Sequence, residues 1–442
     1  MHLHYWLVES ERNPEQDPVV VWFNGGPGAS PLFGLLTELG PLLFSDLSKT
    51  AAYNRTGIPT PIRNAYSWSK TASILCISGP PPVGFSYCER GGVSGSGTSC
   101  GSWNDTRTAA ANYAALQSWA SAFPALAKND LYVAGESYAG LYVTTLVDRI
   151  LDHPGDLRLQ GFLMGDASLG LLDKAHSDPA WRLAFTLEFF HGHAQISDKL
   201  HAAVRSACHV SLSGGAAHQR DASDGSTVLH VGEQCAAMVA KMYNALGGYY
   251  SYNLYDECGA ENVIAAAAVP SLQVDHVART LRLSSPTKRS QHPSVGTSVT
   301  GALNDYPCGG GGMMLKYLAR DEVKDALHVP RDAFFFQCDN GEGFNYTCDT
   351  QTVIPIYHRA LQAGLRVLVY DGDVDPGLNA FYAQNWTSSL GLATLEVSPN
   401  HLPLSPHTTR VHAYDCLPSW PTTLPRSGGR GPSMASSAWA AT

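Results

Sequence analysis

The chain has 442 residues, of which 44% are hydrophobic and 15% charged, so it can bury a large core and is not disordered overall. Its net charge is −9, and no run of its 29 basic residues is long enough to follow a phosphate backbone, so a nucleic-acid partner is not expected. No apolar stretch approaches the length of a bilayer span, so no membrane partner is expected either.

Short runs of β-branched, aromatic and other apolar residues predict buried strands along the chain. They lie at Val19–Phe23, Ser73–Ile77, Leu131–Ala134, Gly161–Met164 and Leu365–Tyr370. Helical spacing lies between them, most clearly from Thr106 to Ala122. Strands separated by helices predict a parallel α/β sheet, which binds its ligands at the carboxyl ends of the strands.

The pattern changes between about residues 171 and 307, where it becomes helix-rich and contains three cysteines. We expect residues 1–170 and 308–395 to form two parts of one core, and residues 171–307 to form a cap insertion with its connector. The four consecutive glycines at 309–312 predict a loop at the return to the core. Residues 396–442 are predicted to be a divergent, disordered tail, because their last part is rich in Pro, Ser, Gly and Ala.

The ten cysteines show no C-x-x-C spacing, which favours disulfides over a zinc or redox site. Two local bridges are predicted, Cys88 with Cys100 and Cys338 with Cys348, because each pair flanks a polar loop. Sequons for N-glycosylation occur at Asn54, Asn104, Asn345 and Asn385. The first residues show no basic or apolar leader pattern, so no signal peptide is expected in this chain.

One serine lies where a hydrolase needs its nucleophile. Residues 135–140 read Gly-Glu-Ser-Tyr-Ala-Gly and join a predicted strand to an apolar helical segment. Such an elbow holds the serine in strained backbone geometry, and the small residues at 135 and 139 keep the strand and the helix from colliding. Ser137 would also need a base and an oxyanion hole.

Two other segments offer partners for Ser137. Residues 371–376, Asp-Gly-Asp-Val-Asp-Pro, follow a strand directly, where an α/β-hydrolase places the carboxylate that orients its histidine. The alternative is a turn that caps a loop or binds a cation. Residues 22–30, Trp-Phe-Asn-Gly-Gly-Pro-Gly-Ala-Ser, would leave backbone N–H groups exposed beside a strand end, or form an ordinary tight turn.

Together these segments resemble the serine carboxypeptidase family, in its cathepsin A-like branch. The matching motifs follow the family order over residues 3–390 and lie at 3–10, 22–30, 82–87, 135–140 and 371–379. The resemblance implies an α/β-hydrolase fold with a helical cap insertion, and removal of the C-terminal residue of a peptide through an acyl-enzyme. It also implies activity at acidic pH in a vacuole, a lysosome or the extracellular space. No cofactor or metal is expected.

The resemblance assigns roles to individual residues. Ser137 matches the nucleophile and Asp375 the triad carboxylate. The N–H groups of Gly26 and Tyr138 match the oxyanion hole.

A second group of residues, Asn24, Gly25 and Glu136, matches the site that recognises the carboxylate of the substrate's C-terminus. Elementary chemistry supports this role for Glu136. An ionised glutamate would repel that carboxylate, whereas a protonated one can donate a hydrogen bond to it. We therefore expect activity to favour acidic pH.

The chain departs from the family pattern at several positions. Ala29 stands where the family has a cysteine bridged to the position of Cys308, and Leu378 also replaces a cysteine. The histidine segment of the family has no match, because the resemblance ends near residue 392. His401, His407 and His412 lie beyond that point, with His412 the best candidate for the base.

Three functional interpretations therefore remain open. The chain is a serine-type carboxypeptidase, or a catalytically impaired member that acts as a binding or stabilising protein, or an acyltransferase that uses the same nucleophile. The two altered ends also suggest a spliced, frameshifted or mispredicted product. Side-chain specificity and oligomeric state are not legible from the sequence.

Overall fold

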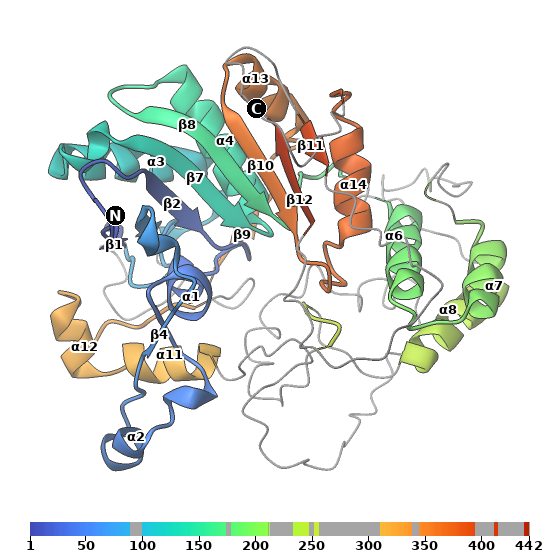
Figure 1. Ribbon diagram of the computed structural model, residues 1–442, viewed down its shortest axis with the longest axis horizontal. Helices are drawn as coiled ribbons and strands as arrows, with labels where there is room; N and C mark the ends of the chain where they lie inside the picture. The colour runs from blue at the N-terminus through green and yellow to red at the C-terminus, as the bar shows by residue number, and fades with distance from the viewer. Residues whose placement is uncertain are drawn as a thin grey trace, which may run out of the picture.

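The structure is a computed structural model that describes residues 1–88, 100–173, 178–210, 212, 233–246, 252–255, 310–337, 344–393, 411–413 and 437–441. An eight-stranded mixed sheet forms its centre, in the order β1-β5-β2-β7-β8-β10-β12-β11 (Figure 1). The strands are β1 (Tyr5–Val8), β2 (Val19–Phe23), β5 (Ser73–Ile77), β7 (Asp130–Glu136), β8 (Arg158–Gly165), β10 (Arg366–Asp371), β11 (Val411–Ala413) and β12 (Ser437–Ala441).

The central strands β5, β2, β7, β8 and β10 run parallel, as predicted, and antiparallel strands close both edges. All five predicted strands are present, and β2 and β5 have the predicted bounds. Two small pairs lie outside the sheet, β3 (Leu42–Leu43) with β4 (Ile62–Arg63), and β6 (Trp103–Asn104) with β9 (Tyr346–Thr347).

Apolar layers cover both faces of the sheet, which explains why its strands are continuous apolar runs. Alternate residues of β2 enter different clusters: Val21 packs on one face and Trp22 on the other. The first face carries α3 (Asp105–Ala122), α4 (Ala139–Asp152), α13 (Ile354–Gln362) and α14 (Ala380–Ser388). The second carries α1 (Pro31–Gly34), the π-helical turn η1 (Leu35–Leu39) and α11 (Gly310–Leu318).

Shorter elements complete the described core. They are α2 (Ala51–Thr56), α12 (Asp321–Ala326) and the 3-10 turns η2 (Asp46–Ser48), η3 (Trp68–Lys70) and η5 (Leu126–Lys128). The loop predicted at glycines 309–312 is wrong for Gly310 to Gly312, which form the first turn of α11. Burial of Met313, Met314 and Leu318 against the core holds this segment in a helix.

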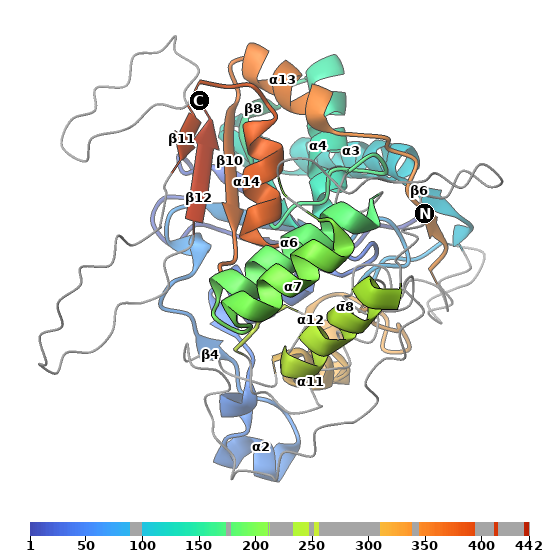
Figure 2. The same ribbon diagram turned by 90° about the vertical axis from the view of Figure 1, so that its right-hand side faces the viewer.

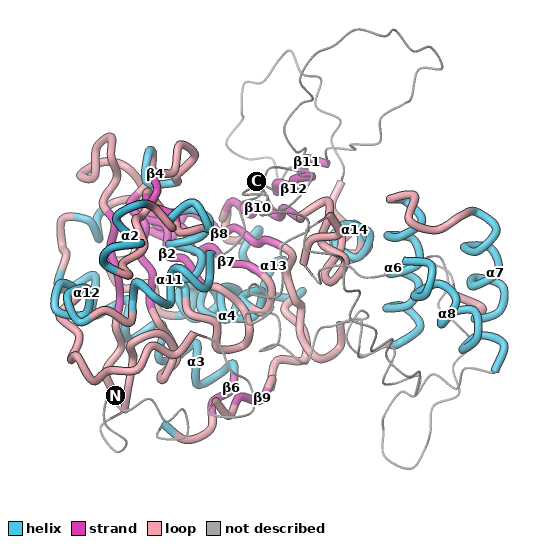
Figure 3. The backbone as a smooth tube through the Cα atoms, turned by 90° about the horizontal axis from the view of Figure 1, so that it is seen from below, coloured by secondary structure: helices cyan, strands magenta, loops and turns pink. Residues whose placement is uncertain are grey.

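The predicted cap contains three described helices, α6 (Pro179–Gly192), α7 (Asp198–Cys208) and α8 (Glu233–Leu246), which lie side by side (Figure 2). They share a separate apolar cluster. In the view from below, α14 lies between the sheet and these helices (Figure 3). Phe381 of α14 packs against the cap cluster, and Tyr382 of α14 meets Phe185 of α6 with ring centroids 5.7 Å apart.

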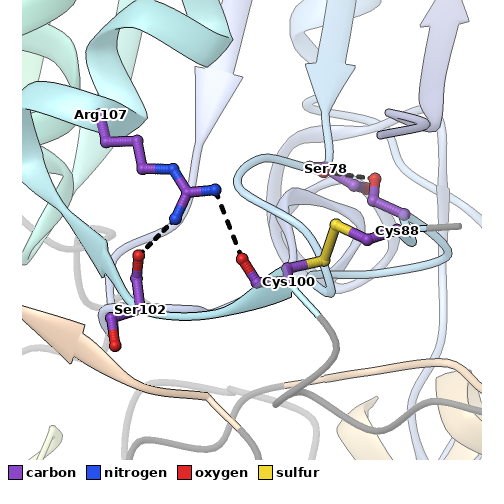
Figure 4. The surroundings of a disulfide bond; sticks show 6 residues. Ser78, Cys88, Cys100, Ser102 and Arg107 are labelled. Atoms are coloured by element: carbon purple, nitrogen blue, oxygen red, sulfur yellow. Dashed lines mark hydrogen bonds between the residues drawn. A yellow bond between two sulfur atoms is a disulfide. The ribbon is translucent and has the colours of Figure 1, made fainter. Parts of the chain in front are cut away.

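The bridge predicted between Cys88 and Cys100 is confirmed (Figure 4). Beside it, Arg107 donates to the carbonyl oxygens of Ser102 and Cys100. The bridge predicted between Cys338 and Cys348 is wrong, because Cys348 carries a free thiol.

A bridge that the sequence did not indicate joins Cys208 of α7 to Cys235 of α8. Strands β11 and β12 fall in the segment that we expected to be a disordered tail, and both join the main sheet. The other residues of that segment lie outside the described residues, as do residues 256–309, the end of the predicted cap insertion with its connector and Cys308. No helix in the described ranges combines the length and the apolarity that a membrane span requires.

Candidate active site

Ser137 lies in a sharp turn between β7 and α4, at the carboxyl end of a central parallel strand. Its φ of 58° is in the left-handed region, so its backbone is strained as expected for a nucleophile elbow. A Cβ at Gly135 would lie 2.7 Å from both the Ala139 Cβ and the Phe23 carbonyl oxygen. A Cβ at Gly140 would lie 2.1 Å from the Ser168 carbonyl oxygen. The small residues of the motif therefore let a strand, a helix and a loop meet at one point.

The glycine turn after β2 lies directly against this elbow. A Cβ at Gly25 would be 2.5 Å from the Tyr138 nitrogen and 2.8 Å from the Ser137 Cβ, so only glycine allows this approach. Gly26 has a φ of 114°, which also requires glycine. Tyr138 is the N-cap of α4, so its N–H has no acceptor within the helix. The backbone segments that carry the two candidate oxyanion donors thus meet beside Ser137.

Asn24 and Glu136 form a hydrogen-bonded pair next to Ser137. The Asn24 Oδ1 accepts from the Trp22 indole N–H at 2.9 Å and from the Gly34 N–H at 3.0 Å. This fixes the amide, so its Nδ2 donates to the Glu136 Oε1 at 2.6 Å. Desolvation raises the pKa of Glu136, and the hydrogen bond from Asn24 opposes that rise in part. Glu136 therefore holds its proton to a higher pH than an ordinary glutamate.

A second carboxyl group at this place, Glu38 of η1, was not predicted. Desolvation first, and then repulsion from Glu136, raise the pKa of Glu38 well above its ordinary value. Glu38 is also exposed to solvent. The sequence feature that could have predicted a carboxyl group here is the one acidic residue in the apolar segment Leu-Leu-Thr-Glu-Leu, which follows the glycine turn.

Asp375 is half-buried in the loop that follows β10. Its Oδ1 accepts from the Gly377 N–H at 2.7 Å. Desolvation raises the pKa of Asp375 to about 7, although backbone N–H groups of Gly377 and Leu378 act in the opposite direction. The candidate triad carboxylate is therefore held by backbone donors.

Two further acids lie beneath this loop. Asp371 is buried, and neither carboxyl oxygen has a hydrogen-bond partner within the described residues. Desolvation, followed by repulsion from Asp375, raises the pKa of Asp371 to about 8. Asp166 accepts from the Gly372 N–H at 2.9 Å, and desolvation and the charges of Asp371 and Asp375 raise its pKa well above the ordinary value.

Asp105, which the sequence analysis missed, supports the elbow from behind. Its Oδ1 accepts from the hydroxyls of Tyr138 and Tyr346 at 2.8 and 2.9 Å. Its Oδ2 accepts from the N–H groups of Asp349 and Thr350, both at 2.9 Å. Desolvation would raise the pKa of Asp105, but these hydrogen bonds outweigh it and lower the pKa. Asp105 therefore fixes the ring of the residue whose N–H is a candidate oxyanion donor.

The structure does not bring His412 to the other candidate residues. His412 lies on edge strand β11 opposite Ala440 of β12, which in turn lies opposite Leu368 of β10. Strand β11 is four positions from β7 in the sheet, so its backbone lies about 19 Å from that of β7, at about 4.8 Å per strand.

His401 and His407 lie outside the described residues. In the described ranges, no histidine hydrogen bonds to the Ser137 hydroxyl or to the Asp375 carboxylate. His193, at the end of α6, reaches the neighbouring loop residue, with its Nε2 3.9 Å from the Asp373 Oδ1.

The chain is similar to known proteins over most of its length. A family model described as serine carboxypeptidase matches residues 1–403. Serine carboxypeptidase ctsa-4.1 of Caenorhabditis elegans is 29% identical over 89% of this chain and 74% of its own length. The lysosomal protective protein of Mus musculus is 30% identical over 87% of this chain and 74% of its own length.

Among solved structures, the prohormone-processing carboxypeptidase Kex1(delta)p of Saccharomyces cerevisiae matches with a TM-score of 0.52 and 16% identity. The match covers 87% of this chain and 71% of that chain. It supports the predicted fold class, an α/β-hydrolase fold.

Proposed function

Because the chain belongs to the serine carboxypeptidase family, we propose that it is a serine-type carboxypeptidase of the cathepsin A-like branch. It releases C-terminal residues from peptides through an acyl-enzyme, and it favours acidic pH. A vacuolar, lysosomal or extracellular location fits this pH preference and the relative named as a lysosomal protein.

In this proposal, the Ser137 hydroxyl attacks the carbonyl of the last peptide bond and its proton passes to a base. The N–H groups of Gly26 and Tyr138 stabilise the oxyanion, and the C-terminal amino acid leaves with its nitrogen protonated. Water then hydrolyses the acyl-enzyme. Asp375 orients the base and stabilises its positive charge. We do not assign His412 as that base, because its strand β11 lies about 19 Å from β7, the strand that leads to Ser137.

The observation that carries the proposal is the pair formed by Glu136 and Asn24 beside Ser137. A carboxyl group that keeps its proton can donate to a substrate carboxylate, and the Gly25 backbone lies against the same point. An esterase for uncharged substrates would gain nothing from an acid there. The site is therefore suited to peptides with a free C-terminus.

The test uses two blocked dipeptides that differ only in a free or an amidated C-terminus. We expect release of the C-terminal amino acid from the free acid at pH 5, and release at least about 10-fold slower from the amide, which loses a charged hydrogen bond. Ser137→Ala should lower the rate by at least about 10³-fold. Ser121→Ala, at an exposed position on α3, is the matched control.

A second candidate function follows from the histidine positions. A family member without a base would bind peptide C-termini without cleaving them. Labelling with a fluorophosphonate separates the two: a Ser137 adduct in the wild-type chain supports catalysis, and its absence in protein with native circular dichroism supports binding alone. Adding an alcohol acceptor to the active enzyme tests the acyltransferase alternative, because a transferase would convert the acyl-enzyme to an ester.

A further inference from the structure

The cap carries a cluster of metal-ligating side chains far from Ser137 in the sequence. Glu188 and His191 lie three residues apart on α6 and so share one face of that helix. His201 lies near the start of α7. One potential ligand atom from each of the three residues lies within 4.8 Å of the others.

We propose that Glu188, His191 and His201 bind a divalent transition-metal ion, Zn²⁺, which ties α6 to α7. Two imidazole nitrogens and a carboxylate oxygen are donors that suit Zn²⁺. In a tetrahedral site with bonds of about 2.1 Å, neighbouring ligand atoms are about 3.4 Å apart. His201 Nε2 and Glu188 Oε1 are 3.1 Å apart, close to this spacing, and the potential ligand atom of His191 lies within 4.8 Å of both residues.

A second carboxylate lies beside the three residues of the cluster. Asp198 lies at the cluster too, with its Oδ1 2.8 Å from the His191 Nε2. The rings of His191 and His201 stack, with centroids 4.0 Å apart and an angle of 21° between their planes. Carboxylate oxygens of Glu188 and Asp198 thus lie beside ring nitrogens of the two histidines, which places oxygen and nitrogen donors together.

The site is also accessible and firmly supported. The side chains of His201, Glu188 and His191 are 12%, 21% and 31% exposed, so they are partly desolvated but an ion can enter from solvent. Between α6 and α7 the metal would act as the Cys208–Cys235 bridge acts between α7 and α8. The three described cap helices would then be joined by strong links in addition to their apolar cluster.

The experiment is a calorimetric titration of the metal-free full-length chain with Zn²⁺ at pH 7.5. We expect one site per chain with a Kd in the micromolar range or tighter. The double variant His191→Ala/His201→Ala should bind at least about 100-fold more weakly, since even the loss of a group that supports a ligand costs 10–100-fold. The double variant His153→Ala/His358→Ala, which removes two histidines outside the cluster, is the control and should keep wild-type affinity.

Co²⁺ gives a second reading of the same site, because its visible spectrum reports nitrogen and oxygen ligands. The spectrum should be present in the wild type and the control, and absent from the cluster variant. Glu188→Gln keeps both rings and should also weaken binding, which provides a test if the histidine variant fails to fold. Wild-type affinity in either folded cluster variant, or no tight Zn²⁺ binding by the wild type, would overturn the proposal.

Discussion

Replacing Glu136 with Gln removes one titrating group beside Ser137 and keeps its shape. The carboxamide oxygen of the Glu136→Gln variant can still accept from the Asn24 Nδ2, as the carboxyl does at 2.6 Å, and its NH₂ group can donate where the protonated acid would. We expect the variant to bind peptides with a free C-terminus at all pH values, whereas the wild type binds them only while Glu136 is protonated.

The direction in which peptide affinity changes with pH follows from the pKa of Glu136, which burial raises from its ordinary value of 4.5. The protonated form is present below that raised pKa and is lost as the pH rises through it. Ionisation removes a hydrogen bond to a charged group, about 1.5–3 kcal/mol. It also adds repulsion of up to about 4 kcal/mol for two charges about 4 Å apart at an effective dielectric constant of 20. The wild-type Kd should therefore rise about 10-fold per pH unit above the pKa, to a total of at least about 10-fold from the lost hydrogen bond alone and more with the repulsion.

The assay measures equilibrium binding in a Ser137→Ala background, so it does not depend on catalysis. A dipeptide with a free C-terminus and its amide are titrated from pH 4 to pH 8 against three proteins: the background alone, with Glu136→Gln, and with Glu15→Gln. Glu15 is exposed and serves as the matched control. Only Glu136→Gln should make the Kd of the dipeptide with a free C-terminus independent of pH.

Two results would refute this reasoning. One is the same loss of affinity with rising pH in the Glu136→Gln variant, which would assign the proton to another group such as Glu38. The other is an identical pH dependence for the amidated peptide, because that ligand carries no C-terminal charge to repel.

Three further predictions concern the fold around the site and the cap. Gly140→Ala should lower the free energy of unfolding by about 3 kcal/mol in urea, because its Cβ would lie 2.1 Å from the Ser168 carbonyl oxygen. Changing Cys208 and Cys235 to Ser should lower it by about 3.5 kcal/mol for a sequence separation of 27; an unchanged urea midpoint would contradict this. Asp371→Asn should raise the Tm more at pH 8 than at pH 5, because a pKa raised to about 8 makes the native state lose stability as the pH rises; an equal gain at both pH values would argue against it.

The strands and the elbow could be predicted because their signals are local. A short run of β-branched and aromatic residues such as Val19–Phe23, bounded by a proline and a glycine turn, favours a strand that is covered on both faces, and the structure gives it those bounds. The elbow needs small residues at fixed offsets from Ser137, which a short motif records.

The features that sequence reasoning missed depend on distant partners. Asp105 accepts from Tyr346, which is 241 residues away, and Glu38 acquires its raised pKa in part from Glu136 on another element. Gly310 was assigned to a loop by its residue type, but buried apolar residues in the following turns hold it in a helix. Tertiary packing determines the contacts of Asp105, the pKa of Glu38 and the helix at Gly310. A pattern within a short segment of sequence cannot predict such packing.

The four acids Glu136, Asp166, Asp371 and Asp375 set the conditions under which this site can work. Each is desolvated and has a raised pKa. In three of the four, the negative charge of another member of the group raises the pKa further. In the described ranges, no Lys, Arg or His forms an ion pair with any of them. Any base that joins Ser137 is therefore attracted as a cation, and its positive charge would lower the pKa of Asp375 from about 7. The acids thus favour a histidine beside Asp375, and below its own raised pKa Glu136 keeps the proton that it donates to a substrate carboxylate.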